Sequence, residues 1–276
     1  MPHVWEPLIL TVAPNGAYKT KGDHPCLPLT AHELAENAAA CLDAGVAVIH
    51  LHVRDLEGRH SLDPDAYRAA TTAIRRAVGD RMVVQISSEA AGRFSPEQQM
   101  AAVRAVQPEA VALALREIAA EGVPEATIAE FFHWLADSDV MIQVILYSTD
   151  DVRRWQELRH RGTIPGGPYW LLFVLGRYTA GQVSSPLDLL PFLNVDDRAY
   201  PWAVCAFGGL EHACALAAAA LGGHVRVGFE NNLHLQDGSL ARDNAALVSQ
   251  LAEAAHVLGR PLADANAVRR LFIRGG

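Results

Sequence analysis

The sequence predicts a single (β/α)8 barrel, also called a TIM barrel, that spans residues 1–276. Short runs of β-branched and apolar residues alternate with Ala-rich helical stretches along the whole chain, a pattern typical of parallel α/β folds. Eight strand–helix pairs can be counted, which is the number that closes such a barrel. No Pro-rich linker or change of composition divides the chain, and barrels of about this length are routinely one domain.

The expected strands are short apolar runs at residues 8–13, 46–53, 82–87, 110–115, 141–147, 169–175, 202–207 and 224–229. Helical patterns lie between and after them, near residues 30–44, 64–78, 96–105, 124–136, 149–160, 186–193, 209–221 and 240–258. Several helices have recognisable starts. Thr30 and Glu33 have the spacing of a capping box, and proline follows Asp63 and Ser95 at a first helical position.

Alternation within the strands indicates a barrel whose polar groups gather at one end. In strand 46–53, Ile49 and Leu51 share one face, whereas His50 and His52 share the other. The outer face of a barrel strand packs against helices and should be apolar, and the inner face lines the interior. Strands 82–87, 110–115 and 224–229 follow the same rule, and their inner faces end in Ser87, Arg116 and Glu230. Barrel enzymes build their sites at this carboxyl end of the strands.

Composition excludes several classes of partner. The formal net charge is −8, and only Lys19 and Lys21 are lysines, so the chain has no basic stripe for nucleic acid or an anionic membrane. The early apolar run LILTVA is too short for a signal sequence, and no run approaches the ~20 residues of a membrane span. The four cysteines form no CxxC pair, which favours reduced thiols in a cytoplasmic protein.

The HLH segment at residues 50–52 is the strongest chemical signal in the sequence. Two residues apart on a strand means a shared face, with Cα atoms roughly 6.6–7 Å apart, a spacing that lets both imidazoles reach one metal ion. Closure of the barrel places the first strand between the second and the eighth, so Glu230 can supply a third ligand. Two histidines and one carboxylate form an open catalytic zinc site. The alternative is that His50 and His52 are hydrogen-bonded core residues.

Other residues are candidates with an open alternative. Gly208 and Gly209 precede a helix after the seventh strand, where free backbone N–H groups bind anions; close helix packing is the alternative. Arg226 faces the interior and needs either a substrate or an acid partner. Arg116 is expected to meet a substrate carboxylate or to pair with an acid such as Glu117. Four histidines are expected on the surface of helices or loops: His160, His212, His234 and His256.

Five segments together resemble the β-keto acid cleavage enzymes, whose best-known activity is the cleavage of 3-keto-5-aminohexanoate. They are TVAPNGA (11–17), HPCLPLT (24–30), AGVAVIHLHVRDLEGRHSLD (44–63), FVLG (173–176) and VRVGFENN (225–232), in order along nearly the whole chain. The resemblance implies a (β/α)8 barrel with a zinc ion in a homotetramer. It also implies a reaction of a β-keto acid with acetyl-CoA that gives acetoacetate and a new acyl-CoA.

The resemblance also implies roles for individual residues. His50, His52 and Glu230 match the zinc ligands, Ser87 matches a serine that holds the substrate carboxylate, and Arg226 matches a catalytic arginine. The chain departs from the family pattern at three positions. Asn231 replaces the acid that acts as the base, Gln143 replaces an acid on the fifth strand, and Asn15 replaces the glutamate that receives the substrate ammonium group.

These departures shape the expected chemistry. A neutral amide cannot remove a proton, so Asn231 is left as a substrate contact, and Glu117 is our candidate for the base. We expect a zinc-dependent condensation of a small β-keto acid with acetyl-CoA, followed by cleavage of the adduct. The alternatives are a zinc-dependent aldolase or hydrolase that needs no acetyl-CoA, and an inactive barrel that binds metal or ligand only.

Overall fold

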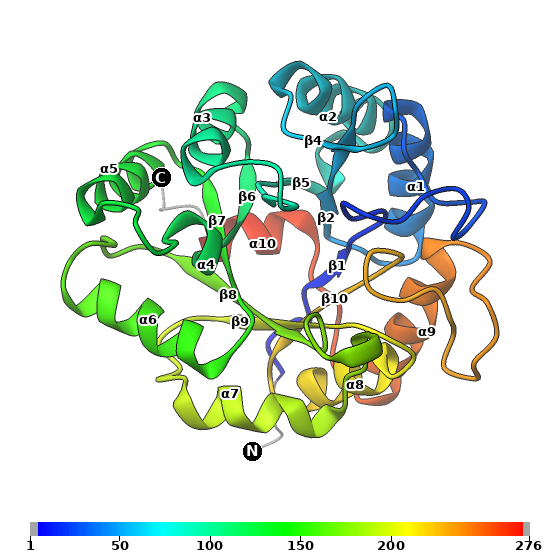
Figure 1. Ribbon diagram of the computed structural model, residues 1–276. Coiled ribbons are helices and arrows are strands. Elements are labelled where there is room, and N and C mark those ends of the chain that lie inside the picture. Colours follow the sequence, from blue (N-terminus) through cyan, green and yellow to red (C-terminus); the bar gives the residue numbers. More distant parts are fainter. Residues whose placement is uncertain (1–4, 273–276) are drawn as a thin grey trace.

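Eight parallel strands close into a barrel, as the alternating sequence pattern predicts (Figure 1). The computed structural model describes residues 5–272. Around the barrel the strands are ordered β1-β10-β9-β8-β7-β6-β5-β2. Their bounds are β1 Leu10–Val12, β2 Val48–Leu51, β5 Val83–Ser87, β6 Ala110–Ala114, β7 Met141–Leu146, β8 Tyr169–Leu175, β9 Trp202–Ala206 and β10 His224–Val227. The prediction of a (β/α)8 barrel is confirmed.

Strand β1 joins the first and last parts of the chain. Thr11 is paired with Arg226 of β10 on one side and with Val48 of β2 on the other. The expected neighbours of the first strand are therefore correct. Since parallel strands share the direction of their carboxyl ends, the residues that follow β2 and β10 come out at the same end of the barrel.

Helices surround the barrel in a ring (Figure 1). Thr30 and Glu33 form the expected capping box, Ser95 caps the helix that begins at Pro96, and Asp63 caps the helix that begins at Pro64. These caps satisfy N–H groups that have no partner within the helix. The main helices are α1 Ala31–Asp43, α2 Pro64–Val78, α3 Pro96–Val106, α5 Glu125–Asp137, α6 Thr149–His160, α7 Leu189–Val195, α8 Glu211–Ala220 and α9 Asn244–Val257.

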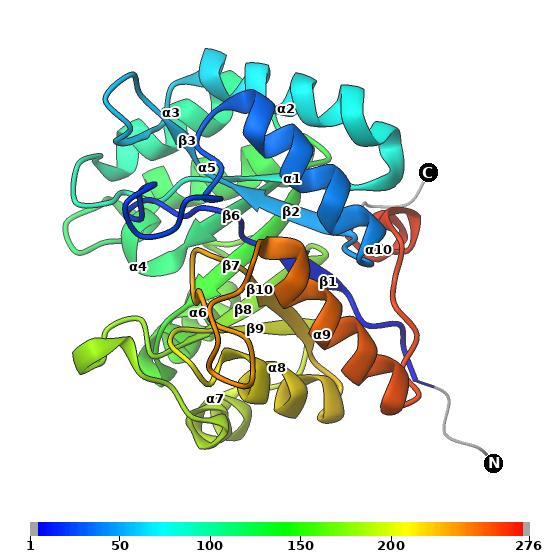
Figure 2. The ribbon, with the colours of Figure 1, turned by 90° about the vertical axis from the view of Figure 1, so that its right-hand side faces the viewer.

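Two apolar layers stabilise the barrel. Ile49 and Leu51 belong to the outer layer between strands and helices, whereas Val48 and Val83 belong to the inner layer. Helix α10 (Ala265–Phe272) adds Phe272 to this inner layer, so it closes the end of the barrel opposite the expected site. Figure 2 shows α10 at the right-hand end of the barrel.

Several short elements were not predicted. Besides α10, they are the hairpin of β3 (Val53–Arg54) and β4 (His60–Ser61), the helix α4 (Leu115–Ile118) and two 3-10 turns, η1 Gly79–Arg81 and η2 Ala180–Gln182. A third 3-10 turn, η3 Pro186–Asp188, begins the helical stretch expected near residues 186–193. Elements of two to four residues carry too few positions for a periodic pattern. His212, expected on the surface, is buried. The Ala-rich helix α8 shows no clear polar face from which this could be predicted. Within residues 5–272, none of the helices has the length and apolarity that a bilayer span requires.

Candidate active site

Three side chains from two neighbouring regions of the barrel meet at its carboxyl end. His50 lies in β2, His52 directly follows that strand, and Glu230 lies three residues beyond the end of β10. One ligand atom from each of the three lies within 4.8 Å of the others. The Oε2 atom of Glu230 is 3.8 Å from Nε2 of His50 and 3.4 Å from Nε2 of His52. The structure thus brings together the trio on which the zinc prediction depends.

Hydrogen-bond partners leave both Nε2 atoms free to bind a metal. The Nδ1 atom of His50 lies 2.8 Å from Oε1 of Gln85, an acceptor, so Nδ1 carries the hydrogen. His60 donates from Nε2 to the Glu89 carbonyl at 2.8 Å, and its Nδ1 therefore accepts from Nδ1 of His52 at 3.4 Å. This support of each ring through its second nitrogen is typical of metal-binding histidines.

Burial reinforces this arrangement. Desolvation lowers the pKa values of His50 and His60 to about 3, so both rings are neutral near pH 7. Nε2 of His52 and Oε2 of Glu230 are buried and have no hydrogen-bond partner among the described residues. Two such atoms in one place are costly unless a ligand satisfies them. A divalent cation fits this donor set.

Arg226 supports Glu230 from the interior of the barrel. Its Nη2 atom donates to Oε1 of Glu230 at 3.0 Å and to Sγ of Cys205 at 3.2 Å. Burial by itself would raise the pKa of Glu230, but Arg226, His52 and His50 together outweigh it, so that pKa lies well below its usual value. The Nε and Nη1 atoms of Arg226 are buried and have no partner among the described residues. Arg226 therefore has an acid partner in Glu230 and also keeps free donors for a substrate.

Two residues predicted to contact the substrate, Asn15 and Asn231, form most of their hydrogen bonds within the protein. The Nδ2 atom of Asn15 donates to the carbonyls of Pro28 and His52 at 3.0 and 2.9 Å, and its Oδ1 accepts from the backbone N–H of His52 at 3.3 Å. Asn231 donates from Nδ2 to Oε1 of Glu211 at 3.3 Å. The Oδ1 atom of Asn231 is buried and unpaired in the described chain. Asn231 can still accept a hydrogen bond from a ligand, whereas the amide of Asn15 is fully used.

The residues expected at the end of the fourth strand have partners of their own. Arg116 donates to Asp151 from Nε at 3.1 Å and from Nη2 at 2.7 Å, and it stacks on Tyr147. Its acid partner is thus Asp151 and not Glu117. Glu117 accepts from the backbone N–H of Ala90 at 2.8 Å. Burial, the largest cause, raises the pKa of Glu117 to about 7.

The glycines before α8 differ from the expectation of free N–H groups. The backbone N–H of Gly208 donates to the carbonyl of Asn231 at 3.2 Å, so it is not available to an anion. The glycine also has a positive φ of 92°, and a Cβ there would lie 2.6 Å from the carbonyl oxygen of Gln182. Close packing, the alternative reading, therefore explains Gly208. An anion contact at Gly209 stays a prediction.

Sequence reasoning missed Glu211, a fully buried carboxyl beneath Asn231. It accepts from the backbone N–H of Gly228 at 3.1 Å and from Nδ2 of Asn232 at 3.3 Å. Burial raises its pKa to about 8 despite these donors. Acidic residues are common in the first turn of a helix, so its position in α8 gave no signal.

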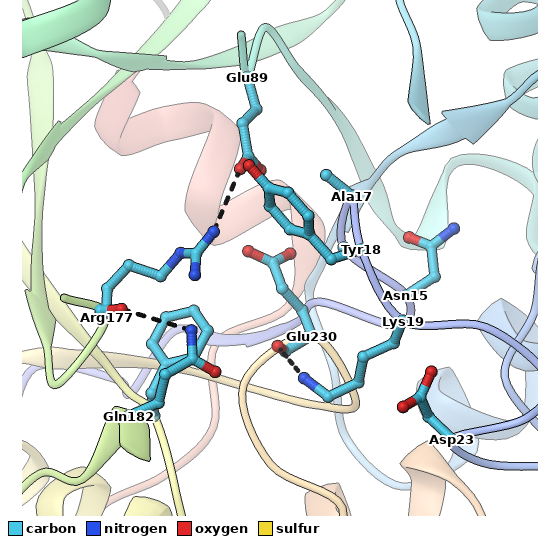
Figure 3. Close-up of a pocket in the computed structure, with 11 residues that line it drawn as sticks. Asn15, Ala17, Tyr18, Lys19, Asp23, Glu89, Arg177, Gln182 and Glu230 are labelled. Atoms are coloured by element: carbon cyan, nitrogen blue, oxygen red, sulfur yellow. Dashed lines mark hydrogen bonds and ion pairs between the residues drawn. The ribbon is translucent and has the colours of Figure 1, made fainter. Parts of the chain in front are cut away.

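A cavity of about 360 Å³ opens beside the trio at the mouth of the barrel (Figure 3). Glu230 lies near the centre of this view, and the charged ends of Glu89 and Arg177 approach each other beside it. Sequence reasoning did not place Glu89 or Arg177 in the site, although Glu89 follows Ser87 at the end of β5. The remaining lining residues are Asn15, Gly16, Ala17, Tyr18, Lys19, Asp23, Gln182 and Phe207. A polar cavity next to the trio has the properties of a substrate site.

Comparison with known proteins gives concordant matches. The sequence model of a family described as beta-keto acid cleavage enzyme matches residues 7–273. The chain is 30% identical to a 3-keto-5-aminohexanoate cleavage enzyme of Fusobacterium nucleatum, over 97% of this chain and 98% of that protein. It is 27% identical to a 3-oxoadipate:acetyl-CoA acetyltransferase of Cupriavidus necator, over 97% and 95% of the two chains.

Solved structures support the fold. The apo structure of ObcA has a TM-score of 0.72 at 19% sequence identity, covering 90% of this chain and 65% of that chain. This chain thus spans about two thirds of the length of ObcA. A 3-dehydroquinate dehydratase from Clostridium difficile has a TM-score of 0.60 at 10% identity, covering 93% and 94%. At these identities the likeness concerns the barrel alone.

Proposed function

Because this chain belongs to the beta-keto acid cleavage enzyme family, we propose that it transfers the acyl part of a small β-keto acid to CoA, with acetyl-CoA as the second substrate. The observation that carries the proposal is the trio of His50, His52 and Glu230 beside a polar cavity. The family match and the trio agree on one reaction class. An aldolase or hydrolase would not need acetyl-CoA, and no feature of the site favours either one.

The reaction balances without water or an oxidant. Loss of a proton from the α-carbon of the β-keto acid gives an enolate, which attacks the acetyl-CoA carbonyl and releases the CoA thiolate. The thiolate then attacks the original keto carbonyl of the adduct. The bond between that carbon and the α-carbon breaks, giving the new acyl-CoA, and protonation of the α-carbon gives acetoacetate.

The chain's own residues divide this work. The free Nε and Nη1 donors of Arg226 stabilise the negative charge that develops on oxygen during these steps. The Ser87 hydroxyl, which accepts from the Glu89 N–H at 3.2 Å, keeps its hydrogen to donate to the substrate carboxylate. Oδ1 of Asn231 accepts a hydrogen bond from the substrate. A divalent cation held by the trio, zinc for this donor set, would supply Lewis-acid polarisation of the keto group when bound.

We assign the base to Glu117, because the N–H of Ala90 holds its carboxyl next to the cavity residue Glu89 and its pKa of about 7 suits proton transfer near neutral pH. Glu117→Gln should lower kcat by about 100-fold or more. Glu121→Gln, a change of the same type at an exposed position four residues away, should leave kcat unaltered. Full turnover by Glu117→Gln would remove Glu117 from the mechanism.

Other residues are assigned roles in positioning a metal ligand, in substrate binding and in assembly. Asn15 positions His52, since it hydrogen bonds to both backbone groups of that residue. Arg116, held by Asp151 at the rim, and Gly209 are assigned to the anionic parts of the substrates. Exposed apolar side chains near η2, η3 and α7 suit subunit contacts in a homotetramer; they are Tyr178, Val183, Leu187, Leu190 and Leu210. The four cysteines are free thiols, which suits a cytoplasmic location.

The proposed function is tested with zinc-loaded protein, acetyl-CoA and a panel of β-keto acids, followed by mass spectrometry. Acetoacetate and a new acyl-CoA should appear together, and only when acetyl-CoA is present. His50→Ala should abolish both products, whereas His160→Ala, at an exposed position in α6, should retain them. Consumption of a keto acid without acetyl-CoA would contradict the proposal.

A further inference from the structure

The cavity beside the metal trio contains one pair of opposite charges that the proposed chemistry does not use. Nη2 of Arg177 lies 3.7 Å from Oε1 of Glu89, and the two side chains are only 19% and 18% exposed (Figure 3). This separation is too long for a hydrogen bond. Neither charged group makes a hydrogen bond within residues 5–272. Their donors and acceptors are therefore available to a ligand.

The other charged groups that line the cavity each have a partner in the protein, and Lys19 and Asp23 lie on the far side of Glu230 from Glu89 and Arg177 (Figure 3). Lys19 donates to the backbone carbonyl of Glu230 at 2.7 Å, and Asp23 accepts from the backbone and the hydroxyl of Thr20 at 2.7 and 3.0 Å. Glu230 is held by Arg226 and faces the histidines. Recognition of the variable part of a substrate therefore falls to Glu89 and Arg177.

Aromatic rings keep the pair in place. The Cζ atom of Arg177 lies 4.9 Å from the ring centre of Tyr18, 5.3 Å from that of Phe207 and 5.6 Å from that of Tyr178. Such contacts restrain the guanidinium, whose N–H groups all lie in its own plane, beside Glu89. Arg177 cannot easily move away when a positive ligand approaches Glu89.

The pair also lies close to the reacting centre. Oε2 of Glu89 is 3.8 Å from Nε2 of His52, one of the proposed metal ligands. A group that reaches Glu89 must therefore be carried on a short side chain near the keto carbon. The cavity volume of about 360 Å³ agrees with a small substrate.

Charge then decides which side chain fits. A cationic or anionic group is attracted by one member of the fixed pair and repelled by the other, so it gains little. A neutral group that both donates and accepts satisfies Glu89 and Arg177 together. We infer that the preferred β-keto acid carries a hydroxyl or a carboxamide on a short side chain, and that Glu89 and Arg177 select it. This inference rests on the proposed function and names its substrate class.

The test compares β-keto acids of equal length whose side chains end in a hydroxyl, an ammonium, a carboxylate or a methyl group. For the zinc-loaded enzyme, kcat/KM should be at least about tenfold higher for the hydroxyl than for either charged acid. Glu89→Gln should raise the carboxylate-to-ammonium ratio of kcat/KM at least about tenfold, because Arg177 is then unopposed. Arg177→Gln should shift the same ratio in the opposite direction by a similar factor.

The matched control is an arginine–glutamate pair outside the barrel. Arg104 of α3 lies 3.1 Å from Glu130 of α5 and stacks on Trp134 at 4.9 Å, so it reproduces the ion pair and the aromatic contact. Arg104→Gln and Glu130→Gln should leave the substrate ranking unchanged. The two cavity variants predict opposite shifts, so one folded variant is enough for a decision.

Calorimetric binding of the same acids without acetyl-CoA separates the two proposals. If no acid is turned over but the binding affinities follow the predicted ranking, the proposed function fails, whereas the selectivity assigned to Glu89 and Arg177 is retained. If turnover occurs and neither cavity variant changes the ranking, the inference is overturned and the function stands. A wild-type preference for a charged acid over the hydroxyl would also overturn the inference.

Discussion

Two buried arginines at opposite ends of the barrel differ in how many of their N–H donors have a hydrogen-bond partner. Arg260, between α9 and α10, is 2% exposed and donates to the carbonyls of Glu6, Ala219 and Gly223 at 2.9, 2.8 and 2.7 Å. Arg226 is 3% exposed, yet its Nε and Nη1 atoms have no partner in the described chain. Burial alone therefore does not separate a structural arginine from a functional one.

Unmet hydrogen-bonding capacity makes the distinction. At the closed end, backbone carbonyls near the start of β1 and β10 surround the guanidinium of Arg260, which joins these segments. At the open end, Arg226, His52 and Glu230 contact one another and each retains unpaired buried atoms. A buried polar atom without a partner is costly, so a cluster of them indicates a ligand. The same substitution at the two arginines should therefore have different consequences.

The largest effect is expected at the open end. Arg226→Lys keeps a positive charge beside Glu230 but removes the planar fork with its free donors. We expect kcat to fall about 100- to 1,000-fold. The free energy of unfolding of the zinc-loaded protein, measured with denaturant, should stay within about 1 kcal/mol of the wild-type value. Retention of full activity would show that the free donors of Arg226 are not catalytic.

Arg260→Lys should have the converse effect. A lysine cannot reach all the carbonyls that the guanidinium joins, so buried acceptors lose their partners. The free energy of unfolding should fall by roughly 2–3 kcal/mol, while kcat per folded molecule is retained. Arg76→Lys, at an exposed position in α2, should change stability by less than about 0.5 kcal/mol. Equal stability of the Arg260 and Arg76 variants would remove the distinction between the two ends.

A third substitution tests whether support of the metal ligands is specific to the open end. His60→Phe removes the acceptor for Nδ1 of His52 but keeps an aromatic ring in place. We expect zinc affinity to fall about 10- to 100-fold, as measured by competition with a chelating dye. His160→Phe serves as the exposed control. An unchanged affinity would show that the position and tautomer of His52 do not depend on His60.

The smallest effect is a pH dependence at the closed end. His224 accepts the backbone N–H of Ile9 at 3.0 Å, and burial lowers its pKa from 6.5 to about 3. The folded state thus binds fewer protons than the unfolded state below pH 6.5, and the contribution of His224 to stability is lost as the pH falls from 6.5 toward 3. Between pH 7.5 and 5.5 this loss is about 1.4 kcal/mol.

Asparagine at this position can accept the same N–H but does not titrate. His224→Asn should therefore lose about 1.4 kcal/mol less than the wild type over this pH range, as measured by denaturant unfolding at each pH. Identical pH profiles for the two proteins would mean that His224 is not held neutral by the fold.

The sequence was most informative where a pattern repeats. The alternation of Ile49 and Leu51 with His50 and His52 predicted both the strand and the face of the paired imidazoles. It was least informative where one residue decides the outcome. Asp151 as the partner of Arg116, the buried position of His212 and the cavity pair of Glu89 and Arg177 all depend on contacts between distant parts of the chain.

By itself, the sequence determined the eight strands of the barrel and, in four of them, the inner and outer faces and the polar residues at the end of the inner face. These properties depend on local periodicity, which neighbouring residues fix. The tertiary structure alone decided that His60 and Gln85 set the histidine tautomers, and that Arg260 is saturated while Arg226 is not. The physical reason is that hydrogen-bond satisfaction depends on which distant groups barrel closure brings within about 3 Å of each polar atom.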